Sequence, residues 1–303
     1  MKALFAAPDA LWPRWQEPLR RACEGVAELV RDAAPEAVDA IIYAPGGDVR
    51  DFTPFTRARL VQSLWAGVET IVTNDTLTQP LARMVDPGLA LGMRDYCLGW
   101  ALRLHLGMDV YAQDGVWRNG TVPPLASERR VTVLGMGELG RAVAQGLAGA
   151  GFDVAGWSAS GRPVEGMTVL AGPDLDKALA RAEILVCLLP DTPATNNLLN
   201  AARLAQLPRG AAIINPGRGT LIDDDALIAA LDSGALAHAV LDVFRAEPLP
   251  PAHPFWAHPG VTVTPHIAAE TRPETASALV GENLRRLRDG RPILHLVDRA
   301  AGY

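Results

Sequence analysis

The sequence predicts an α/β fold with parallel sheets, and two observations carry this prediction. Short apolar runs alternate with stretches of helical periodicity along nearly the whole chain, which is typical of parallel sheets covered on both faces. In addition, a glycine-rich turn joins an apolar strand directly to a helix near the middle of the chain. With 303 residues, of which 49% are hydrophobic and 20% charged, the chain is long enough to form two domains.

The first hundred residues already show the alternation of strands and helices. Apolar runs and helical patterns follow each other at 3–6, 12–23, 26–30, 38–43, 59–65 and 70–73. A long and mostly apolar helix is expected over 92–106, and it leads towards the glycine-rich turn. We interpret this helix as a bridge between two domains.

The glycine-rich turn follows a strand expected at 131–134 and opens a helix with apolar residues at helical spacing. It consists of Gly135, Met136, Gly137, Glu138, Leu139 and Gly140. Gly135 would permit a tight turn, Gly137 would let the backbone approach a pyrophosphate, and Gly140 would let the helix pack closely on its strand. The N–H groups at the start of the helix would then face the phosphates. We interpret the turn as a dinucleotide-binding site; the alternative is an ordinary strand-to-helix turn.

After this turn the strands and helices alternate regularly. Strands are expected at 131–134, 153–157, 184–189, 211–215, 238–243 and 261–264. Helices are expected between them, including one at 174–182 and one at 225–231. Asp174 and Asp223 are the expected N-caps of these two helices, and Gly234 is expected to end the second. About six strands with crossover helices make a doubly wound dinucleotide domain. A last helix over 271–288 most simply returns to the first domain.

Charge and composition argue against several classes of partner. The formal net charge is −6 with acids and bases interspersed, so no basic face for nucleic acid and no polybasic membrane anchor is expected. No run of about 18 apolar residues is present, and the N-terminal segment lacks the layout of a signal peptide. We therefore expect a cytoplasmic protein that does not bind membranes.

The cysteines and histidines show no pattern that predicts a metal site. Cys23, Cys97 and Cys187 are far apart and form no C-x-x-C, which argues against a disulfide framework or a zinc site. Cys187 lies inside an apolar run and is expected to be buried. His253 and His258 are close in sequence, but they lie in a proline-rich loop where solvated or loop-packing histidines are more common than ligands.

The end of the second strand of this domain indicates which dinucleotide is bound. A carboxylate is expected there if the ligand is NAD, because it would hold the ribose 2′-hydroxyl. The sequence instead continues from Trp157 with Ser158, Ser160 and Arg162. Two hydroxyls and a cation suit a 2′-phosphate, which a carboxylate would repel. We favour NADP(H) over NAD(H); otherwise Arg162 simply points into solvent from a polar hairpin.

Three later strand ends carry polar groups at the edge where open α/β sheets bind ligands. Arg218 lies between two glycines after the strand at 211–215 and is expected to clamp an anion. Glu247 lies in a proline-containing loop, and His266 follows the strand at 261–264. Each residue taken alone is more commonly structural or solvated. Together they form an acid-base set, in which His266 moves the proton and Glu247 fixes its tautomer and stabilises its charged form.

Several motifs in one order resemble the D-isomer-specific 2-hydroxyacid dehydrogenases, and within them the glyoxylate/hydroxypyruvate reductase A type. The segments that carry the resemblance are 134–140, 188–195, 215–219, 241–250 and 264–269. The resemblance covers essentially the whole chain. It implies a Rossmann domain, residues 98–272, inserted into a smaller flavodoxin-like lid domain, residues 1–97 and 273–303. It also implies a homodimer built through the nucleotide domains.

The resemblance further implies roles for individual residues. Arg218 would polarise the keto group and bind the carboxylate, with His266 as the acid-base residue and Glu247 as its partner. The turn formed by Ala66, Gly67 and Val68, which already suggests backbone N–H groups facing an anion, would bind the substrate carboxylate. Asp242 would lie near the nicotinamide carboxamide. The remaining residues implied to line the cofactor are Met136, Glu138, Leu139, Leu189, Pro190, Thr195, Pro216, Gly217 and Ala268.

These features predict an NADPH-dependent reductase of small 2-keto acids such as glyoxylate or hydroxypyruvate. One alternative is an NAD-dependent dehydrogenase of longer 2-hydroxy acids. A second alternative, of a different class, is a non-catalytic regulator that senses NADP(H) on the same fold, because fold does not determine function. The presence of Arg218, Glu247 and His266 together counts against the regulator.

Overall fold

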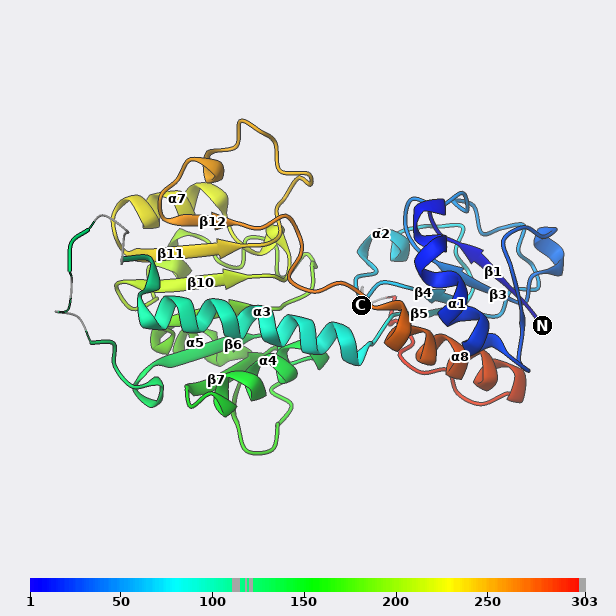
Figure 1. Ribbon diagram of the computed structural model, residues 1–303, viewed down its shortest axis with the longest axis horizontal. Helices are drawn as coiled ribbons and strands as arrows, with labels where there is room; N and C mark the ends of the chain where they lie inside the picture. The colour runs from blue at the N-terminus through cyan, green and yellow to red at the C-terminus, as the bar shows by residue number, and fades with distance from the viewer. Residues whose placement is uncertain (111–114, 118, 120–121, 300–303) are drawn as a thin grey trace. The chain divides into compact units, whose positions relative to one another are not determined.

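The computed structural model describes residues 1–110, 115–117, 119 and 122–299. The chain divides into two compact units, which we call unit 1 (Met1–Leu89 with Thr271–Tyr303) and unit 2 (Ala90–Glu270) (Figure 1). The sequence predicts the two boundaries between these units slightly later, after residues 97 and 272. Residue 97 lies inside helix α3 (Pro87–Leu106), which continues without a break past the first boundary.

Unit 1 is built on a five-stranded parallel sheet with the order β2-β1-β3-β4-β5. Its strands are β1 (Lys2–Ala6), β2 (Glu28–Val30), β3 (Ala40–Tyr43), β4 (Val61–Ser63) and β5 (Leu81–Ala82). Its helices are α1 (Trp12–Cys23), α2 (Glu69–Val72) and α8 (Pro273–Asp289), with short 3-10 turns at Asp9–Leu11 and Pro35–Ala37. Helix α8 packs against α1, and side chains of both helices share one core with β1 and β3.

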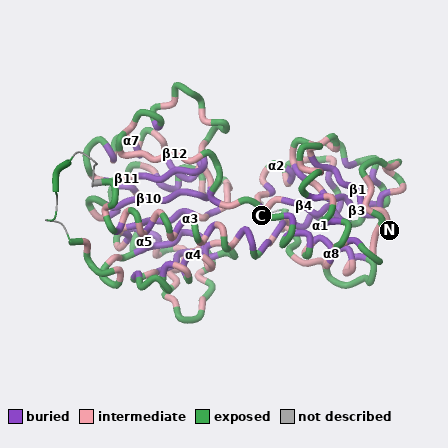
Figure 2. The backbone as a smooth tube through the Cα atoms, viewed as in Figure 1, coloured by how far each residue is buried: buried purple, intermediate pink, exposed green. Residues whose placement is uncertain are grey.

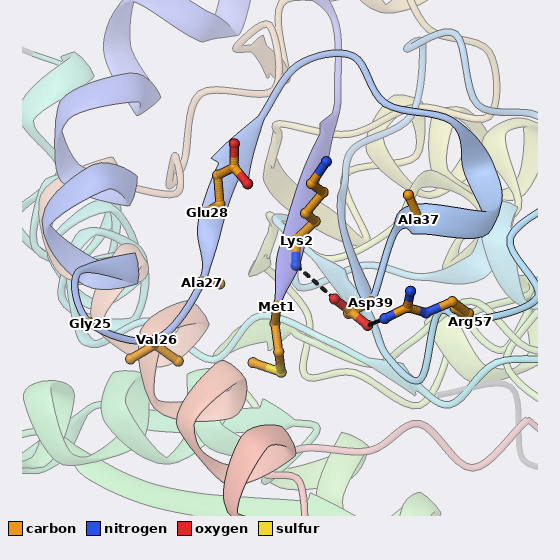
Figure 3. Close-up of a pocket in the computed structure, with 9 residues that line it drawn as sticks. All are labelled: Met1, Lys2, Gly25, Val26, Ala27, Glu28, Ala37, Asp39 and Arg57. Carbon is orange, nitrogen blue, oxygen red and sulfur yellow. Dashed lines mark hydrogen bonds and ion pairs between the residues drawn. The ribbon is translucent and has the colours of Figure 1, made fainter.

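A shallow hollow lies at the amino edge of this sheet and is shown in Figure 3. Asp39 stands one residue before β3 and accepts a hydrogen bond from the Lys2 amide at 2.8 Å. Its other carboxylate oxygen accepts from Arg57, also at 2.8 Å. The contact with Lys2 joins the starts of the neighbouring strands β1 and β3.

Unit 2 contains a seven-stranded parallel sheet with the order β12-β11-β10-β9-β6-β7-β8. Its strands are β6 (Arg130–Leu134), β7 (Asp153–Ser158), β8 (Thr168–Ala171), β9 (Ile184–Cys187), β10 (Ala211–Asn215), β11 (Leu236–Leu241) and β12 (Val261–Val263). This is the doubly wound order, with the direction of winding reversing between β6 and β9. The predicted α/β class is confirmed, but the sequence missed β8 because this short edge strand is only half-buried.

Helices cover both faces of this sheet. They are α3, α4 (Glu138–Gly149), α5 (Leu175–Arg181), α6 (Ala201–Leu204) and α7 (Asp224–Asp232), with 3-10 turns at Met108–Val110, Ala126–Glu128, Gly172–Asp174, Gly219–Leu221 and Pro254–Trp256. Side chains of α5, α6 and α7 share one core cluster, and those of α3 and α4 share another. The central strands β9 and β10 are therefore buried along their whole length, and Figure 2 shows this for β10.

The two predicted helix caps have different outcomes. Asp223 caps α7 by accepting a hydrogen bond from the Ala226 amide at 3.0 Å, and Gly234, with φ of +65°, follows the end of that helix. Asp174 does occupy the N-cap position of α5, as predicted, but its side chain makes no capping hydrogen bond. A 3-10 turn leads into α5 and gives Asp174 a ψ of 17°, so its carboxylate pairs with Lys177 instead.

All three cysteines are free and buried, as the sequence predicted for Cys187. Within the described residues, no helix combines the length and the apolar character that a membrane span requires. The same part of the chain contains no group of three or more His, Cys, Asp or Glu side chains arranged to hold a metal ion.

Candidate active site

Three glycines shape the turn between β6 and α4 in three different ways. Gly135 has φ of +99°, and a Cβ atom there would overlap the Leu188 carbonyl. A Cβ atom on Gly140 would overlap the Gly135 carbonyl, so the helix start packs directly on the turn. At Gly137, in contrast, an added Cβ would meet no protein atom within 4 Å. The open space at Gly137 lies at the start of α4, where a helix favours an anion.

The other side chains of this turn face different surroundings. Met136 is buried and lies over Gly156, where a Cβ atom would overlap its thioether. Leu139 packs against the core cluster that includes α3 and α4. Glu138 is exposed and pairs with Arg141 of the same helix. The turn therefore presents its backbone, rather than apolar side chains, to the open space.

The loop after β7 is organised by the two serines that the sequence singled out. The Ser158 hydroxyl accepts from the Gly161 amide at 3.1 Å, and the Ser160 hydroxyl accepts from the Arg162 amide at 3.4 Å. Each hydroxyl keeps its own proton as a donor, and Arg162 is exposed. Trp157 is buried, and its indole nitrogen has no hydrogen-bond partner among the described residues.

The loop after β9 lies beside the glycine turn. The Leu188 amide donates to the Leu134 carbonyl at 2.8 Å, and Leu189 is buried. The Thr195 hydroxyl donates to the Pro190 carbonyl at 2.7 Å and accepts from the Thr192 amide at 2.9 Å. Thr195 therefore uses its hydroxyl proton to shape this loop.

Arg218 follows β10 on a loop that Asn215, the last residue of the strand, holds closed. The Asn215 amide nitrogen donates to the Arg218 carbonyl at 2.9 Å, while its oxygen accepts from the Gly217 amide at 3.2 Å. Asn215 is only 1% exposed, and the neighbouring Pro216 is also buried. The sequence contained Asn215 within a motif but gave no signal for its role, because the role depends on loop geometry.

Close backbone approaches connect the Arg218 loop to its neighbours on both sides. A Cβ atom on Gly217 would press against the Cys187 carbonyl at the end of β9. A Cβ atom on Gly219 would overlap the backbone of Phe244, just after β11. The Arg218 guanidinium donates to the Gly217 carbonyl at 2.7 Å and is half-buried.

His266 and Glu247 meet at this same edge of the sheet. His266 Nδ1 lies 2.7 Å from Glu247 Oε2, and the other carboxylate oxygen accepts from the Phe244 amide at 2.9 Å. Because a carboxylate oxygen accepts, Nδ1 carries the hydrogen of this bond. Nε2 is then the ring nitrogen that remains to exchange a proton with another molecule. Both side chains are exposed enough to reach a ligand.

The backbone of His266 is held in an unusual conformation by Asp242. His266 has φ of +53°, a left-handed value that is uncommon for residues other than glycine. Its amide donates to the Asp242 carbonyl at 2.9 Å. The Asp242 carboxylate accepts from the Ile267 and Ala268 amides, both at 2.9 Å. Asp242 is fully buried, so its carboxylate serves this turn directly.

The strand order brings these loops together. Sheet neighbours β6, β9, β10, β11 and β12 all end at one edge, and each of their loops touches the next. Arg218, Glu247 and His266 therefore lie on three adjacent loops of unit 2. The exposed loop with Ser160 and Arg162 follows β7, on the other side of the glycine turn.

The turn with Ala66, Gly67 and Val68 belongs to unit 1, where it follows β4. The Ser63 hydroxyl accepts from the Trp65 amide at 3.0 Å and donates to the Trp65 carbonyl at 3.0 Å. Val68 is buried at the start of α2. The turn thus lies at the carboxyl edge of its own sheet.

Comparisons with known proteins agree with this arrangement. The family model described as D-isomer specific 2-hydroxyacid dehydrogenase, NAD binding domain, matches residues 97–268. The glyoxylate/hydroxypyruvate reductase A of Serratia proteamaculans is 40% identical over 258 residues, which cover 82% of this chain and 82% of that protein.

Two solved structures are similar along the whole chain. A D-isomer specific 2-hydroxyacid dehydrogenase from Xanthobacter autotrophicus, in complex with NADPH and MES, has a TM-score of 0.93 and 39% identity, covering 100% of this chain and 99% of that chain. An NADPH-dependent glyoxylate/hydroxypyruvate reductase from Sinorhizobium meliloti, in complex with NADP and sulfate, has a TM-score of 0.85 and 33% identity, with coverage of 100% and 99%. The similarity therefore includes both units.

Proposed function

This chain belongs to the D-isomer specific 2-hydroxyacid dehydrogenase family, and from that premise we propose that it reduces small 2-keto acids, such as glyoxylate and hydroxypyruvate, with NADPH. The observation that carries the proposal is the 2.7 Å contact between His266 and Glu247 at the sheet edge that also holds the glycine turn. The relatives from Serratia and Sinorhizobium, named as reductases of glyoxylate and hydroxypyruvate, support this choice of substrates.

In the proposed mechanism the chain's own residues bind the acid and supply a proton. Glu247 orients the imidazole through Nδ1, so that a protonated His266 delivers its Nε2 proton to the oxygen on C2 of the keto acid. Arg218 pairs with the carboxylate and stabilises the negative charge that grows on that oxygen. A bound nicotinamide, when reduced, supplies the hydride that C2 accepts.

The residues of unit 2 fit a dinucleotide with a 2′-phosphate. Gly137 leaves open space at the start of α4 for a pyrophosphate. Ser158, Ser160 and Arg162 follow β7 with no carboxylate among residues 158–162. We therefore assign NADP(H) as the preferred cofactor, with NAD(H) as a weaker one. The NADPH and NADP complexes of the two similar structures support this preference.

Removing the cation of this loop tests the cofactor preference. Arg162→Ala should raise the KM for NADPH about ten-fold, because a charge-assisted contact to phosphate is lost, and should change the KM for NADH little. An equal change for both cofactors would contradict the proposed phosphate contact.

The two units are assigned different tasks. Unit 2 binds the cofactor, which the family match over 97–268 supports. Unit 1 is proposed to supply backbone N–H groups of the Ala66–Val68 turn to the substrate carboxylate. Substrate specificity is therefore expected to respond to changes in unit 1.

The proposal includes a homodimer formed through unit 2. Six large apolar side chains among the described residues from 106 to 125 are exposed, and we propose that a second copy covers them. The exposed residues are Leu106, Met108, Val116, Trp117, Val122 and Leu125. We also propose a cytoplasmic location, which the three free cysteines support, because disulfides are rare in that compartment. Light scattering of the purified protein tests the dimer, and cell fractionation tests the location.

One panel of assays tests the function. Glyoxylate, hydroxypyruvate, pyruvate and phenylpyruvate are each supplied with NADPH and with NADH, and cofactor oxidation is followed. The first two acids with NADPH should react fastest, and His266→Ala should lower kcat by about 100-fold or more. A fully active His266→Ala enzyme would overturn the assignment of His266 as the proton donor. Binding of NADPH without acceleration by any acid would favour the regulator instead.

A further inference from the structure

A chain of hydrogen bonds runs from helix α3 to the turn that carries His266. The Tyr96 hydroxyl lies 2.7 Å from the Thr264 hydroxyl, although the two residues are 168 positions apart. The Thr264 hydroxyl donates to Asp242 Oδ1 at 2.5 Å. Thr264 has a single hydroxyl proton, and the carboxylate accepts it, so the hydrogen between Tyr96 and Thr264 must come from Tyr96.

Tyr96 is suited to act as a permanent donor in this chain. Its side chain is half-buried, and burial raises the pKa of the Tyr96 phenol well above its ordinary value. The nearby Asp242 carboxylate raises this pKa further. The phenol therefore keeps its proton throughout the pH range in which the enzyme works.

The acceptor end of this chain controls the backbone of His266. Asp242 Oδ1 accepts both from Thr264 and from the Ile267 amide, while Oδ2 accepts from Ala268. The main-chain carbonyl of the same residue accepts from His266. A carboxylate rotated away from this position would release the amides that stabilise the left-handed conformation of His266. The hydroxyl of Thr264 opposes that rotation because it donates a second hydrogen bond to Oδ1.

The two elements that this chain joins both lead to unit 1. Helix α3 starts at Pro87 in unit 1 and carries Tyr96 into unit 2. The segment after His266 leaves unit 2 at Glu270. On the unit 1 side, the Asp86 carboxylate accepts from the Leu89 amide at 3.0 Å and from the Arg272 amide at 3.3 Å. Hydrogen bonds thus tie the two connecting segments together within each unit.

We propose that Tyr96 is a positioning residue for His266, acting through Thr264 and Asp242 to fix the direction in which the imidazole presents Nε2. This inference rests on the proposed function, because it assigns a purpose to the orientation of the proton donor. Tyr96 itself touches neither substrate nor cofactor in this role. Its removal should therefore slow the chemical step while leaving cofactor binding nearly unchanged.

The test uses the full chain and two conservative variants that each remove one hydroxyl. Tyr96→Phe and Thr264→Val should each lower kcat about five- to ten-fold, because one hydrogen bond of the chain is lost, with KM for NADPH within about two-fold of the wild type. Thr264→Ser keeps a hydroxyl and should restore most of kcat. The double variant should be no slower than Thr264→Val, because both changes break the same chain.

Thr262 offers a matched control on β12, the strand that ends just before Thr264. Thr262 stands two residues before Thr264, and its hydroxyl lies 2.8 Å from His238 Nε2. It takes no part in the hydrogen bonds that link Tyr96 to Asp242. Thr262→Val should therefore leave kcat unchanged. Equal losses in Thr262→Val and Thr264→Val would show a general effect on the strand and overturn the proposal. Wild-type kcat in Tyr96→Phe would also overturn it.

Hydrogen exchange separates this inference from the proposed function, because it needs no turnover. In Tyr96→Phe the amides of His266, Ile267 and Ala268 should exchange at least about three-fold faster than in the wild type, with the amides of β10 unchanged. If these amides exchange faster in Tyr96→Phe but the protein reduces none of the keto acids, the proposed function is refuted. The structural link from Tyr96 to the His266 backbone is then still supported. Unchanged exchange at these amides would refute the link, whatever the activity.

Discussion

The amino edges of the two sheets share one arrangement, in which a carboxylate before one strand binds the first residue of the neighbouring strand. In unit 1, Asp39 precedes β3, accepts from the Lys2 amide at 2.8 Å and donates its own amide to the Lys2 carbonyl at 2.9 Å. In unit 2, Glu183 precedes β9, accepts from the Arg130 amide at 2.9 Å and donates to the Arg130 carbonyl at 3.0 Å. Arg57 also pairs with Asp39, and both Arg129 and Arg130 pair with Glu183. We call these two carboxylate arrangements the amino-edge clamps. Each joins the first strand of its sheet to the neighbouring strand at the point where the direction of winding reverses.

The carboxyl edges of the same two sheets differ. In unit 2, the buried residues Asn215 and Asp242 hold the loops of Arg218 and His266 in fixed shapes. In unit 1, the corresponding edge has a turn closed by the Ser63 hydroxyl. The comparison shows a division of labour, in which amino edges stabilise the sheets and carboxyl edges present groups to ligands. The four predictions below test this division.

The largest effect is expected at the glycine turn, where packing and ligand access can be separated. Gly140→Ala should destabilise unit 2 by about 2 kcal/mol or more, because its Cβ would overlap a backbone carbonyl. Gly137→Ala should leave stability within about 0.5 kcal/mol and raise the KM for NADPH at least ten-fold, on the order of a lost phosphate contact. Urea unfolding and steady-state kinetics measure the two effects. Similar stability for the two variants would contradict the separation.

A smaller effect is expected at the end of β10. Asn215→Asp removes the donor to the Arg218 carbonyl and puts a negative charge against that carbonyl, so kcat/KM for the keto acid should fall about ten-fold. Asn200→Asp makes the same chemical change at the N-cap of α6, where an oxygen acceptor suffices, and should have no effect. Equal kinetics in both variants would argue against a positioning role for Asn215.

The two amino-edge clamps should affect stability and not catalysis. Burial, the strongest single influence, raises the pKa of Asp39 and of Glu183, but hydrogen bonds and arginines outweigh it and leave each pKa below its ordinary value. Each carboxylate therefore stabilises the fold above the pKa of the unfolded chain, and the stabilisation is lost as the pH falls through the lower folded pKa. Asp39→Asn and Glu183→Gln should each cost about 1 kcal/mol at pH 7.

Unfolding at two pH values checks the sign of this effect. The difference between wild type and each variant should shrink below about pH 4, where the wild-type carboxylates become protonated. Reductase activity at pH 7 should stay the same in both variants. If either variant loses more activity than folded protein, the amino edges contribute to catalysis as well as to stability, which contradicts the comparison.

The smallest effect is expected at the carboxyl edge of unit 1. Ser63→Ala removes the hydroxyl that closes the turn before Ala66, so the KM for the keto acid should rise about three-fold while the KM for NADPH stays constant. Thr73→Ala, which removes an exposed hydroxyl after α2, is the control and should change neither constant. A parallel rise in both KM values would show that the turn does not act on the acid alone.

The sequence predicts the repetitive parts of this fold because they depend on local periodicity. Buried runs such as 184–189 and 211–215 identify strands well, and Asp223 correctly predicts the start of α7. Strand β8 was missed because an edge strand that is half-exposed lacks a continuous apolar run. The sequence places Asp174 correctly at the N-cap of α5 but does not reveal the 3-10 turn before it, after which the side chain makes no capping bond.

For the site, the sequence identifies residues but not their supports. Strand ends show that Arg218, Glu247 and His266 lie along one edge, and acid-base chemistry predicts the contact between Glu247 and His266. Their supports are set by tertiary contacts that leave no local pattern. Tyr96, for instance, meets Thr264 across 168 residues of sequence, and no spacing rule connects them.

The return of α8 to unit 1 has a consequence for the order in which the protein matures. The core of unit 1 includes Ala276, Val280 and Leu284 of this helix, so it cannot close until α8 has been synthesised. Unit 2 is continuous and completes its sheet earlier on the ribosome. During translation, the cofactor-binding unit therefore acquires its core first, while the strands of unit 1, although made earlier, wait for their last helix.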